Sequence, residues 1–133
     1  SKTGIQYILL ARASQKMSTI ESKIGEVLLQ ARISKSYKGY SYLERAIFLI
    51  IEDETRLCSI YEEVYTRIGR HFNVAPTSVE KNLRTLRDSF WQNNGYDYFK
   101  EQCGITLYNR PFPREMIEIL AEQVIKKMKY EQN

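Results

Sequence analysis

The residues best suited to chemistry lie on one side of a helix expected between Pro76 and Trp91. At about 100° per residue, that side collects basic, hydroxyl and acidic side chains. They are Thr77, Lys81, Arg84, Thr85 and Asp88, with Glu80 and Trp91 on the flank. Lys and Arg donate to guanine O6 and N7, and Glu accepts from the cytosine amino group. These residue types, at this spacing, fit a helix that reads base edges in the major groove. An ordinary water-facing helix surface is the alternative.

Two helices joined by a short turn would hold this surface in place. The second helix carries an apolar stripe at helical spacing, formed by Val79, Leu83, Leu86 and Phe90, and the first carries Val64, Ile68 and Phe72. Between them, Asn73 tolerates the left-handed conformation that ends a helix, and Pro76 cannot continue one. Gly69 would let the second helix approach closely. This layout is that of a helix-turn-helix.

Phosphate contacts are expected around the reading helix. In helix-turn-helix proteins the first helix crosses the DNA backbone, so Arg67 and Arg70 are candidates. Lys35 and Lys38 lie in a polar loop, for which a solvated surface loop is the alternative, and Lys100 and Arg110 follow the reading helix in the chain. Secondary base contacts are expected from Thr77, Ser78 and Thr85.

Glu80 has two alternative roles. With Thr77 it matches a capping box, in which the glutamate would cap its own helix. If Pro76 is instead the first helical residue, Ala75 is the cap and Glu80 is free to face a base. The sequence leaves this choice open.

The whole chain reads as all-α, a compact bundle of about six helices. Four Ser/Thr–Glu capping boxes predict helix starts, at Ser18/Glu21, Ser41/Glu44, Ser59/Glu62 and Thr77/Glu80. The first predicted helix runs from Ser18 to about Ile33, and the loop 34–39 follows. The next helix ends before or within 52–54, and the first helix of the helix-turn-helix starts between Ser59 and Thr66. Gln92–Gly95 predicts a stop and turn, 98–102 a short helix, 105–113 an extended segment, and Pro113 the start of the last helix.

Two regions are expected along the chain. Residues 1–17 form an N-terminal segment or linker with an extra short helix, and residues 18–133 form the helix-turn-helix domain. The segment would either pack on the bundle or self-associate, and the sequence does not choose between these.

Composition bounds the function. The 133 residues suffice for one domain, and the net charge of +4 permits an acidic partner without requiring one. Cys58 and Cys103 are expected to be reduced thiols in or near the core. His71 is the only histidine, so a metal site is not expected. No catalytic motif, cofactor motif or membrane-spanning run occurs, which favours a cytoplasmic protein that is not an enzyme.

A set of residues extending beyond the helix-turn-helix resembles a known family. They are Lys38-Gly39-Tyr40, Tyr42-Leu43, Ala46-Ile47, Ser59-Ile60, Tyr65, Ile68, Phe72-Asn73, Val79-Glu80, Arg84 and Trp91. In these positions the chain resembles the DNA-binding output domain of the sporulation-initiation response regulators, the stage 0 sporulation protein A family. The resemblance reaches from about Ile20 to the C-terminus and is dense from Lys38 to Trp91.

The resemblance implies a bundle of about six helices that binds a short promoter box as tandem protomers. It implies base reading by Glu80, Lys81 and Arg84 and protomer contact through the last helix, for which closing the bundle is the alternative. Separately, the acidic residues 52–54 and the aromatic residues Tyr96, Tyr98 and Phe99 would suit a protein partner such as RNA polymerase. Lys81 stands where the family often has Arg, and Ser78 also replaces a basic residue. Since Lys lacks the planar fork that matches guanine, a looser or shifted sequence preference is expected. No receiver domain is readable, so a phosphoacceptor aspartate would lie outside this chain.

Two functions are therefore carried forward. The first is a sequence-specific DNA-binding transcription regulator that resembles a two-component output domain. The second is a helical protein-interaction module that keeps the fold without specific DNA binding. The DNA box, the target genes, activation or repression, and the oligomeric state are not given by the sequence.

Overall fold

The computed structural model describes residues 3–131, which fold into six α-helices and no strand. The α-helices are α1 (Gly4–Gln30), α2 (Gly39–Glu52), α3 (Thr66–Phe72), α4 (Pro76–Phe90), α5 (Tyr96–Gln102) and α6 (Pro113–Glu131). A 3₁₀ turn, η1 (Glu54–Ser59), and a π turn, η2 (Tyr61–Tyr65), lead into α3, and a second π turn, η3 (Trp91–Gly95), links α4 to α5. The all-α bundle expected from the sequence is confirmed.

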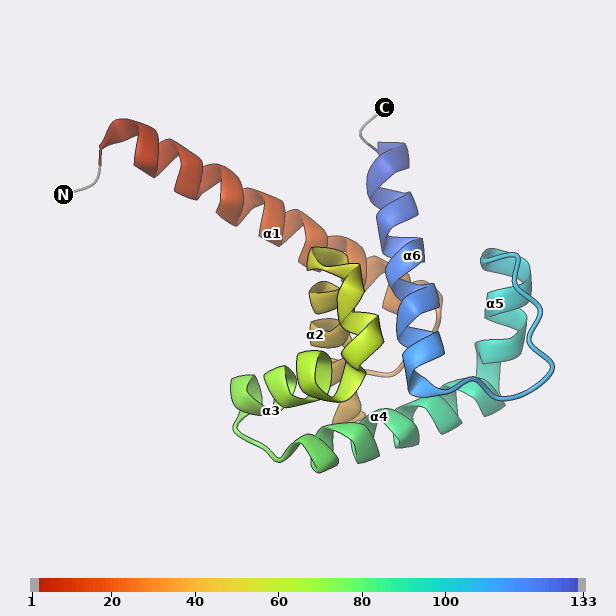
Figure 1. The fold of residues 1–133 in the computed structure, drawn as a ribbon. Coiled ribbons are helices and arrows are strands. Elements are labelled where there is room, and N and C mark those ends of the chain that lie inside the picture. The colour runs from red at the N-terminus through yellow and green to blue at the C-terminus, as the bar shows by residue number, and fades with distance from the viewer. Residues whose placement is uncertain (1–2, 132–133) are drawn as a thin grey trace.

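Helix α2 lies at the centre of the bundle. It packs against α1, α4 and α6, and Leu43, Ala46 and Ile47 on it are completely buried. From α6 the core receives Met116, Ile117, Leu120 and Val124, all fully buried. Figure 1 shows α4 along one edge of the molecule and α6 crossing above it.

Helix α1 corrects the prediction for the N-terminus. One helix runs without a break from Gly4 to Gln30, so the N-terminal segment is neither a separate short helix nor an irregular linker. Its cap is a capping box at Thr3 and Gln6, and not the box expected at Ser18. The expected boundary between residues 17 and 18 falls inside this helix. As a domain boundary it stays a prediction, although burial changes close to it, because Met17 is 46% exposed and Ile20 is 8% exposed.

The helix starts predicted from two further capping boxes, at Ser41 and Ser59, are also wrong. Helix α2 begins at Gly39 with Lys38 at the cap position, so Ser41 is already helical. Near Ser59 the chain is wound as the 3₁₀ turn η1 and then the π turn η2, so no fresh α-helix starts there. A local Ser-x-x-Glu pattern does not fix a helix start when the preceding residues are themselves held helical by packing.

The turn expected at Gln92–Gly95 is a bend within a helical stretch. The π turn η3 keeps the chain wound, and α5 leaves it at an angle to α4 (Figure 1). Gly95 lies against the ring of Phe90, where an added Cβ would come within 2.9 Å of the ring edge. A π turn is a recognised cause of a helix kink, and here the close contact at Gly95 accompanies it.

The two cysteines differ from each other. Cys103 packs against the core, as expected, and burial raises its pKa to about 11. Cys58 is exposed, so the prediction that it lies in or near the core is wrong. It sits on the 3₁₀ turn η1, none of whose residues is buried.

Candidate nucleic-acid interface

A tight turn joins α3 to α4. Asn73 ends α3 in the left-handed conformation, with φ 56° and ψ 50°. The Val74 amide donates to the Gly69 carbonyl at 2.9 Å. A Cβ on Gly69 would lie 2.6 Å from the Val74 carbonyl oxygen, so the glycine admits the returning turn and not the body of the second helix. The turn predicted around Asn73 and Pro76 is confirmed.

Helix α4 is anchored along one complete face. Val79 and Leu83 are fully buried, and Leu86 and Phe90 nearly so, as the stripe predicted. On α3, Ile68 is buried, but Phe72 is 37% exposed and not part of the sealed core. The Phe72 ring instead packs 5.2 Å from the ring of Tyr42 at the end of the helix. The orientation of α4 is therefore set by its own burial more than by the last turn of α3.

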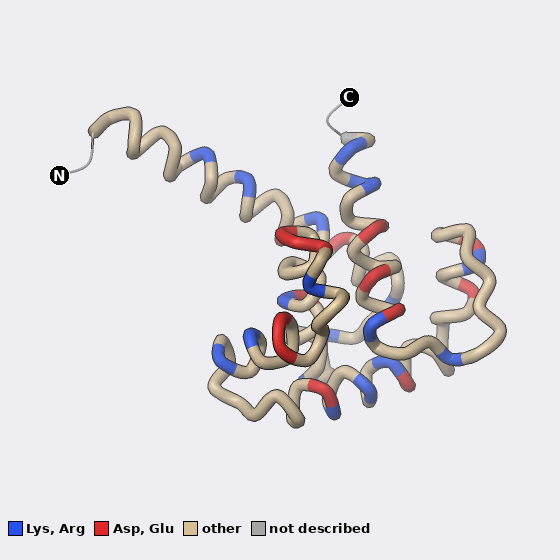
Figure 2. The backbone as a smooth tube through the Cα atoms, in the orientation of Figure 1, with Lys and Arg blue, Asp and Glu red and all other residues tan. Residues whose placement is uncertain are grey.

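The outward side of α4 holds the residues predicted to read bases. Thr77, Lys81, Arg84 and Thr85 are all exposed, and Ser78 and Glu80 are half-buried. The Thr85 hydroxyl donates to the Lys81 carbonyl at 3.1 Å, which leaves its oxygen lone pairs free to accept. Figure 2 shows Lys and Arg positions recurring along α4 at the edge of the molecule. The structure brings the residues predicted to read bases together on one surface, which we call the α4 outer face.

Glu80 does not cap its own helix. Pro76 is the first helical residue and Ala75 is the cap, without a side-chain hydrogen bond. The Glu80 carboxylate accepts instead from the Arg84 guanidinium one turn further on. Burial raises the pKa of Tyr65, and the negative charge of Glu80 raises it further, which places this flank of α4 beside η2. Two of the three residues expected to read bases thus form an ion pair in the free protein.

Asp88 is a second acid on α4 besides Glu80, and two arginines pair with it. Arg87 Nε donates to Asp88 Oδ1 at 2.8 Å, and Arg110 Nη1 donates to the same oxygen at 2.9 Å. Arg87 is only 6% exposed and also donates to the Pro111 carbonyl at 3.1 Å. The connection between α5 and α6 is therefore fastened to α4, and Arg110 lies beside the outer face. This role of Arg87 was not predicted from the sequence. Its position next to Leu86, on the side of the helix that carries the apolar stripe, could have indicated that it is buried.

The loop that carries Lys35 and Lys38 lies along the other flank of α4. The Tyr37 hydroxyl lies 2.6 Å from the Ser89 Oγ and donates to it. A Cβ on Gly39 would come within 2.5 Å of the Asn82 carbonyl oxygen, so this glycine lets the start of α2 touch α4. Both lysines are exposed, and Lys38 occupies the cap position of α2. The N-terminal end of a helix attracts anions, so the lysines and the helix end favour the same kind of ligand.

The remaining candidate phosphate contacts lie on α3 and α5. Arg67 and Arg70 are exposed on α3, and Arg67 Nε donates to Glu63 at 2.9 Å. No ion pair involves Arg70 among residues 3–131. Lys100 belongs to α5, which turns away from α4 (Figure 1), and its ammonium lies 6.0 Å from the centre of the Tyr96 ring. Of these candidate cations, Arg110 is the one that the structure ties to α4, through Asp88, whereas Arg67 is paired with Glu63 and Lys100 lies on α5.

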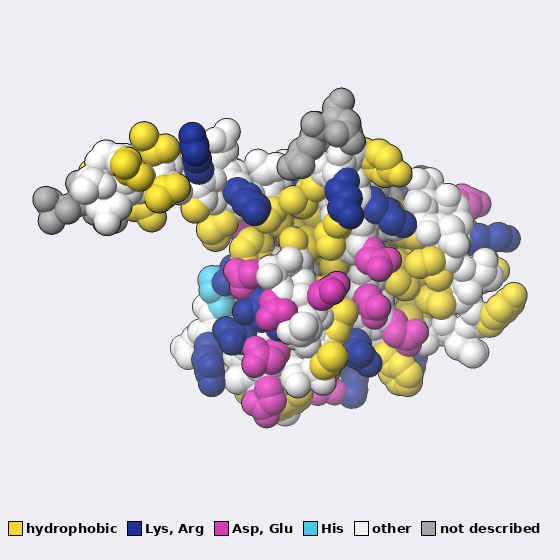
Figure 3. Space-filling view, turned by 45° about the horizontal axis from the view of Figure 1, so that its top comes forward, with side chains coloured by type: hydrophobic (Ala, Val, Ile, Leu, Met, Phe, Trp, Pro, Cys, Tyr) yellow, Lys and Arg dark blue, Asp and Glu magenta, His cyan; other side chains and the backbone are white. Residues whose placement is uncertain are grey.

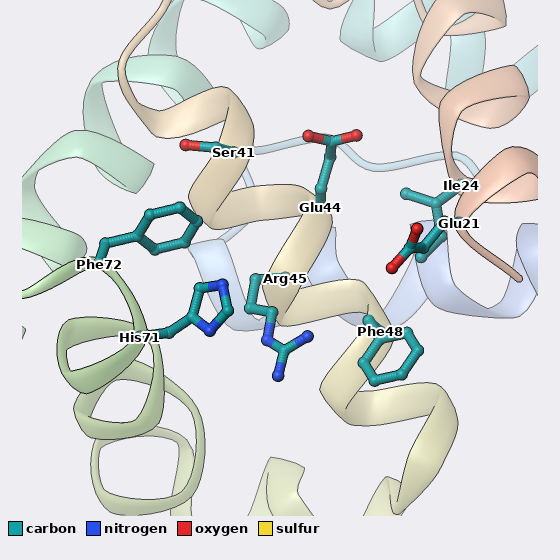
Figure 4. Close-up of a pocket in the computed structure, with 8 residues that line it drawn as sticks. All are labelled: Glu21, Ile24, Ser41, Glu44, Arg45, Phe48, His71 and Phe72. Carbon is teal, nitrogen blue, oxygen red and sulfur yellow. The ribbon is translucent and has the colours of Figure 1, made fainter. Parts of the chain in front are cut away.

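A cleft lies between α1, α2 and α3, whose side chains line it (Figure 4). It is lined by Glu21, Ile24, Ser41, Glu44, Arg45, Phe48, His71 and Phe72. His71 is exposed, and its ring makes an edge contact with Phe72. Within the described residues, no three His, Cys, Asp or Glu side chains gather as a metal site. No helix in that part of the chain is long and apolar enough to cross a membrane.

The fold and the outer face define a class of protein, the all-α helix-turn-helix domains whose second helix turns basic and hydroxyl side chains to solvent. Residues 24–124 match the sequence model described as the C terminal of the sporulation initiation factor Spo0A. The match covers most of the chain, and the chain belongs to this family. The family is a DNA-binding output domain of a sporulation response regulator, and it is a regulatory family and not an enzyme family.

Proposed function

We propose that the protein is a sequence-specific transcription regulator whose α4 enters the major groove of a promoter box. Lys81 and Arg84 would donate to bases and Glu80 would accept, with Thr77, Ser78 and Thr85 as secondary contacts. The observation that carries the proposal is the division of α4 into a fully buried apolar face and an outer face whose exposed residues are basic or hydroxyl. A helix held rigidly on one side, with donors on the other, suits base readout.

The phosphate contacts would flank α4 on both sides. Arg67 and Arg70 would bind the backbone from α3, and Lys35 and Lys38 from the loop fastened by Tyr37. Arg110 is fixed beside the outer face by Asp88, whereas Lys100 would contribute only through a longer DNA segment. These contacts would position the protein without reading sequence.

The ion pair between Glu80 and Arg84 predicts how specificity arises. Off DNA the glutamate holds the arginine and repels phosphate. On the correct box Glu80 and Arg84 would each form a hydrogen bond with a base, and these two bonds would replace the ion pair between them. On other sequences the carboxylate stays a cost, because buried unpaired charges are unfavourable. Glu80 would thus discriminate against wrong sequences as well as accept from a cytosine.

Two protein partners belong to the same proposal. A second protomer on the DNA would contact the last helix, α6, whose C-terminal part exposes Lys126 and Tyr130. RNA polymerase would be recruited by the bound protein. A protein-interaction module without specific DNA binding is the competing outcome of the test below.

Fluorescence anisotropy tests the base-reading residues. Labelled duplexes carrying the family's box or a scrambled sequence are titrated with wild type, Lys81→Ala, Arg84→Ala and Glu80→Gln. Each alanine variant should lose about 1–3 kcal/mol of binding free energy on the box and much less on the scramble. Glu80→Gln should bind the scramble more tightly, which reduces the ratio between the two duplexes.

Arg12→Ala is the matched control, because this exposed arginine lies on the far part of α1, at the opposite end of the molecule from α4 (Figure 1). It should bind both duplexes as wild type does. Salt titrations should give a log–log slope near −0.9 for each phosphate neutralised. If the alanine variants lost equal binding free energy on both duplexes, α4 would bind only the DNA backbone and would not read bases. No binding of wild type to either would overturn the proposal and favour the protein-interaction module.

A further inference from the structure

The first half of α1 leaves the bundle as an uncovered apolar arm, defined here as residues 4–17 (Figure 1). Its large apolar side chains are open to water: Ile5 is 71%, Leu9 57%, Leu10 50% and Met17 46% exposed. Figure 3 shows these yellow side chains gathered along the arm. A helix of this length is marginal in water without packing, so this surface is suited to a partner.

One stripe of the arm continues the buried face of α1. Within the bundle, α1 packs on α2 and α6 through Ile20, Ile24 and Val27. Counting back at alternating steps of three and four residues, the same face carries Met17, Ala13, Leu10 and Gln6. These steps are those of helices that pack along their length. The stripe therefore has the pattern of a packed helix where no other described residue covers it.

The stripe reads the same from both ends. Gln6, Leu10, Ala13 and Met17 are separated by steps of four, three and four residues. In an antiparallel pair with a second copy, Leu10 of each chain lies opposite Ala13 of the other, and Met17 of each chain lies opposite Gln6 of the other. Large side chains then meet small or polar ones, which is how facing helix positions fill space. The spacing is that of any heptad stripe, but the large-against-small pairing of Leu10 with Ala13 lets an identical chain pack on it.

The charges of the arm favour the same arrangement. Between residues 4 and 20 the only charged side chains are Arg12 and Lys16, and neither lies on the stripe. In an antiparallel pair Lys16 lies beside Tyr7 of the other arm, and only the two Arg12 residues lie level with each other, near the two-fold axis and turned roughly 130° away from the stripe. A parallel pair would place like cations side by side, and it would also bring each partner helix into the space that α2 and α6 occupy.

We propose that two copies of the chain associate through antiparallel pairing of these arms. The interface is isologous, because the same stripe serves both copies about a two-fold axis near residues 11 and 12. It is small beside the roughly 800 Å² per partner of a standard interface, so dimerisation should be weak and concentration-dependent. It uses a different surface from α4 and α6 and is independent of the proposed DNA contacts.

Sedimentation equilibrium tests the association with a matched pair of variants. Ala13 lies on the stripe. At about 100° per residue, Ala11 lies roughly 130° around the helix from the centre of the stripe. Both are exposed, so Ala13→Glu and Ala11→Glu leave the bundle intact. Wild type and Ala11→Glu should rise from the 15.7 kDa of the monomer toward twice that mass between micromolar and several hundred micromolar protein. Ala13→Glu should stay monomeric, a loss of at least tenfold in association.

Three results would overturn the proposal. Wild type could stay monomeric at the highest concentration, both variants could dimerise equally, or both could fail to dimerise. The last would point to association through the other side of the arm. Circular dichroism of each variant confirms that the helical content is kept.

Disulfide trapping tests the direction of pairing. In a Cys58→Ser background, chains carrying Gln6→Cys and chains carrying Met17→Cys are oxidised separately and as a mixture. Antiparallel arms hold two copies of residue 6 about 16 Å apart, at about 1.5 Å per residue, too far for a disulfide. Only the mixture should cross-link, at least tenfold faster than either chain alone. Cross-linking of either chain alone at the same rate would mean a parallel pair and overturn the arrangement.

Discussion

The outer face of α4 and the arm of α1 are both helix surfaces open to water, and they present opposite chemistry. The exposed residues of α4 are Thr77, Lys81, Arg84 and Thr85, all polar, whereas the arm exposes aliphatic side chains as large as Ile5 and Leu10. Charged donors in water suit a polyanion, and an apolar stripe in water suits another protein surface. The same bundle therefore offers two kinds of surface, and each residue type indicates its own kind of partner.

The two helices also differ in what holds them. Helix α4 has a buried face along its whole length, whereas only the second half of α1 is buried. The position of α4 is fixed by the core, so its side chains are presented in one orientation. The arm extends from the bundle and depends on its own helical hydrogen bonds, so its stability should respond little to changes in the core.

The largest expected effect comes from one substitution made in both helices. Leu83 on α4 is completely buried, so Leu83→Ala should lower the free energy of unfolding by about 2–5 kcal/mol. Leu10 on the arm is 50% exposed, so Leu10→Ala should change it by less than about 0.5 kcal/mol. Urea unfolding of dilute, monomeric protein measures both. A comparable loss from Leu10→Ala would show that the arm folds back on its own bundle in solution.

The second prediction compares two glycines. A Cβ at Gly69 would meet the Val74 carbonyl at 2.6 Å, so Gly69→Ala should destabilise the protein by about 1–3 kcal/mol through overpacking of the turn. Gly25, inside α1, has nothing within 4 Å of an added Cβ. Gly25→Ala should therefore stabilise by about 0.5–1 kcal/mol, since Ala is the better helix former. Thermal unfolding of the two variants gives the signs.

Opposite signs in that pair would confirm that the α3–α4 turn is tightly packed and that α1 has room around its middle. A neutral Gly69→Ala would mean that the turn relaxes easily, and α4 would then be held by its buried face alone. The DNA affinity of Gly69→Ala distinguishes a rigid turn from one that relaxes. A displaced turn would move Lys81 and Arg84 relative to Arg70 and so change the affinity.

Helical periodicity predicted the parts of this fold that depend on burial. The stripe from Val79 to Phe90 and the start of α6 at Pro113 are both confirmed. These predictions succeed because apolar residues at helical spacing form one face of the helix, and that face is the one that is buried. The position of Asn73 at the end of α3 was readable for a similar reason, since few residues accept a left-handed backbone.

Features set by contacts between distant residues were not readable. Nothing local to Ser18 reveals that the helix already began at Gly4, and Asn94-Gly95 has the sequence of a turn although the chain stays helical there. The Glu80–Arg84 pair follows from spacing of four residues, but the Arg110–Asp88 bond joins residues 22 apart. The base-reading roles stay predictions, because they depend on a partner as well as on the fold.

The smallest expected effect concerns the cleft between α1, α2 and α3. Burial raises the pKa of Glu44, Lys35 lowers it in part, and Glu21 on α1 raises it further. A carboxyl whose pKa is raised in the folded state favours folding below its ordinary value of 4.5, and that contribution is lost as the pH rises through the folded pKa. At neutral pH the ionised Glu44 is therefore a cost to stability.

Glu44→Gln removes that charge and keeps the shape, so it should stabilise the protein at pH 7, by less than about 0.5 kcal/mol. The gain should vanish below pH 4.5, where wild-type Glu44 takes up its own proton. Glu122→Gln, an exposed glutamate on α6, is the matched control and should change stability little at either pH. Thermal unfolding at the two pH values makes the comparison. A destabilised Glu44→Gln at pH 7 would show that the carboxylate holds a favourable partner in solution, and that the junction of α1 with α2 is tied by charge and not strained by it.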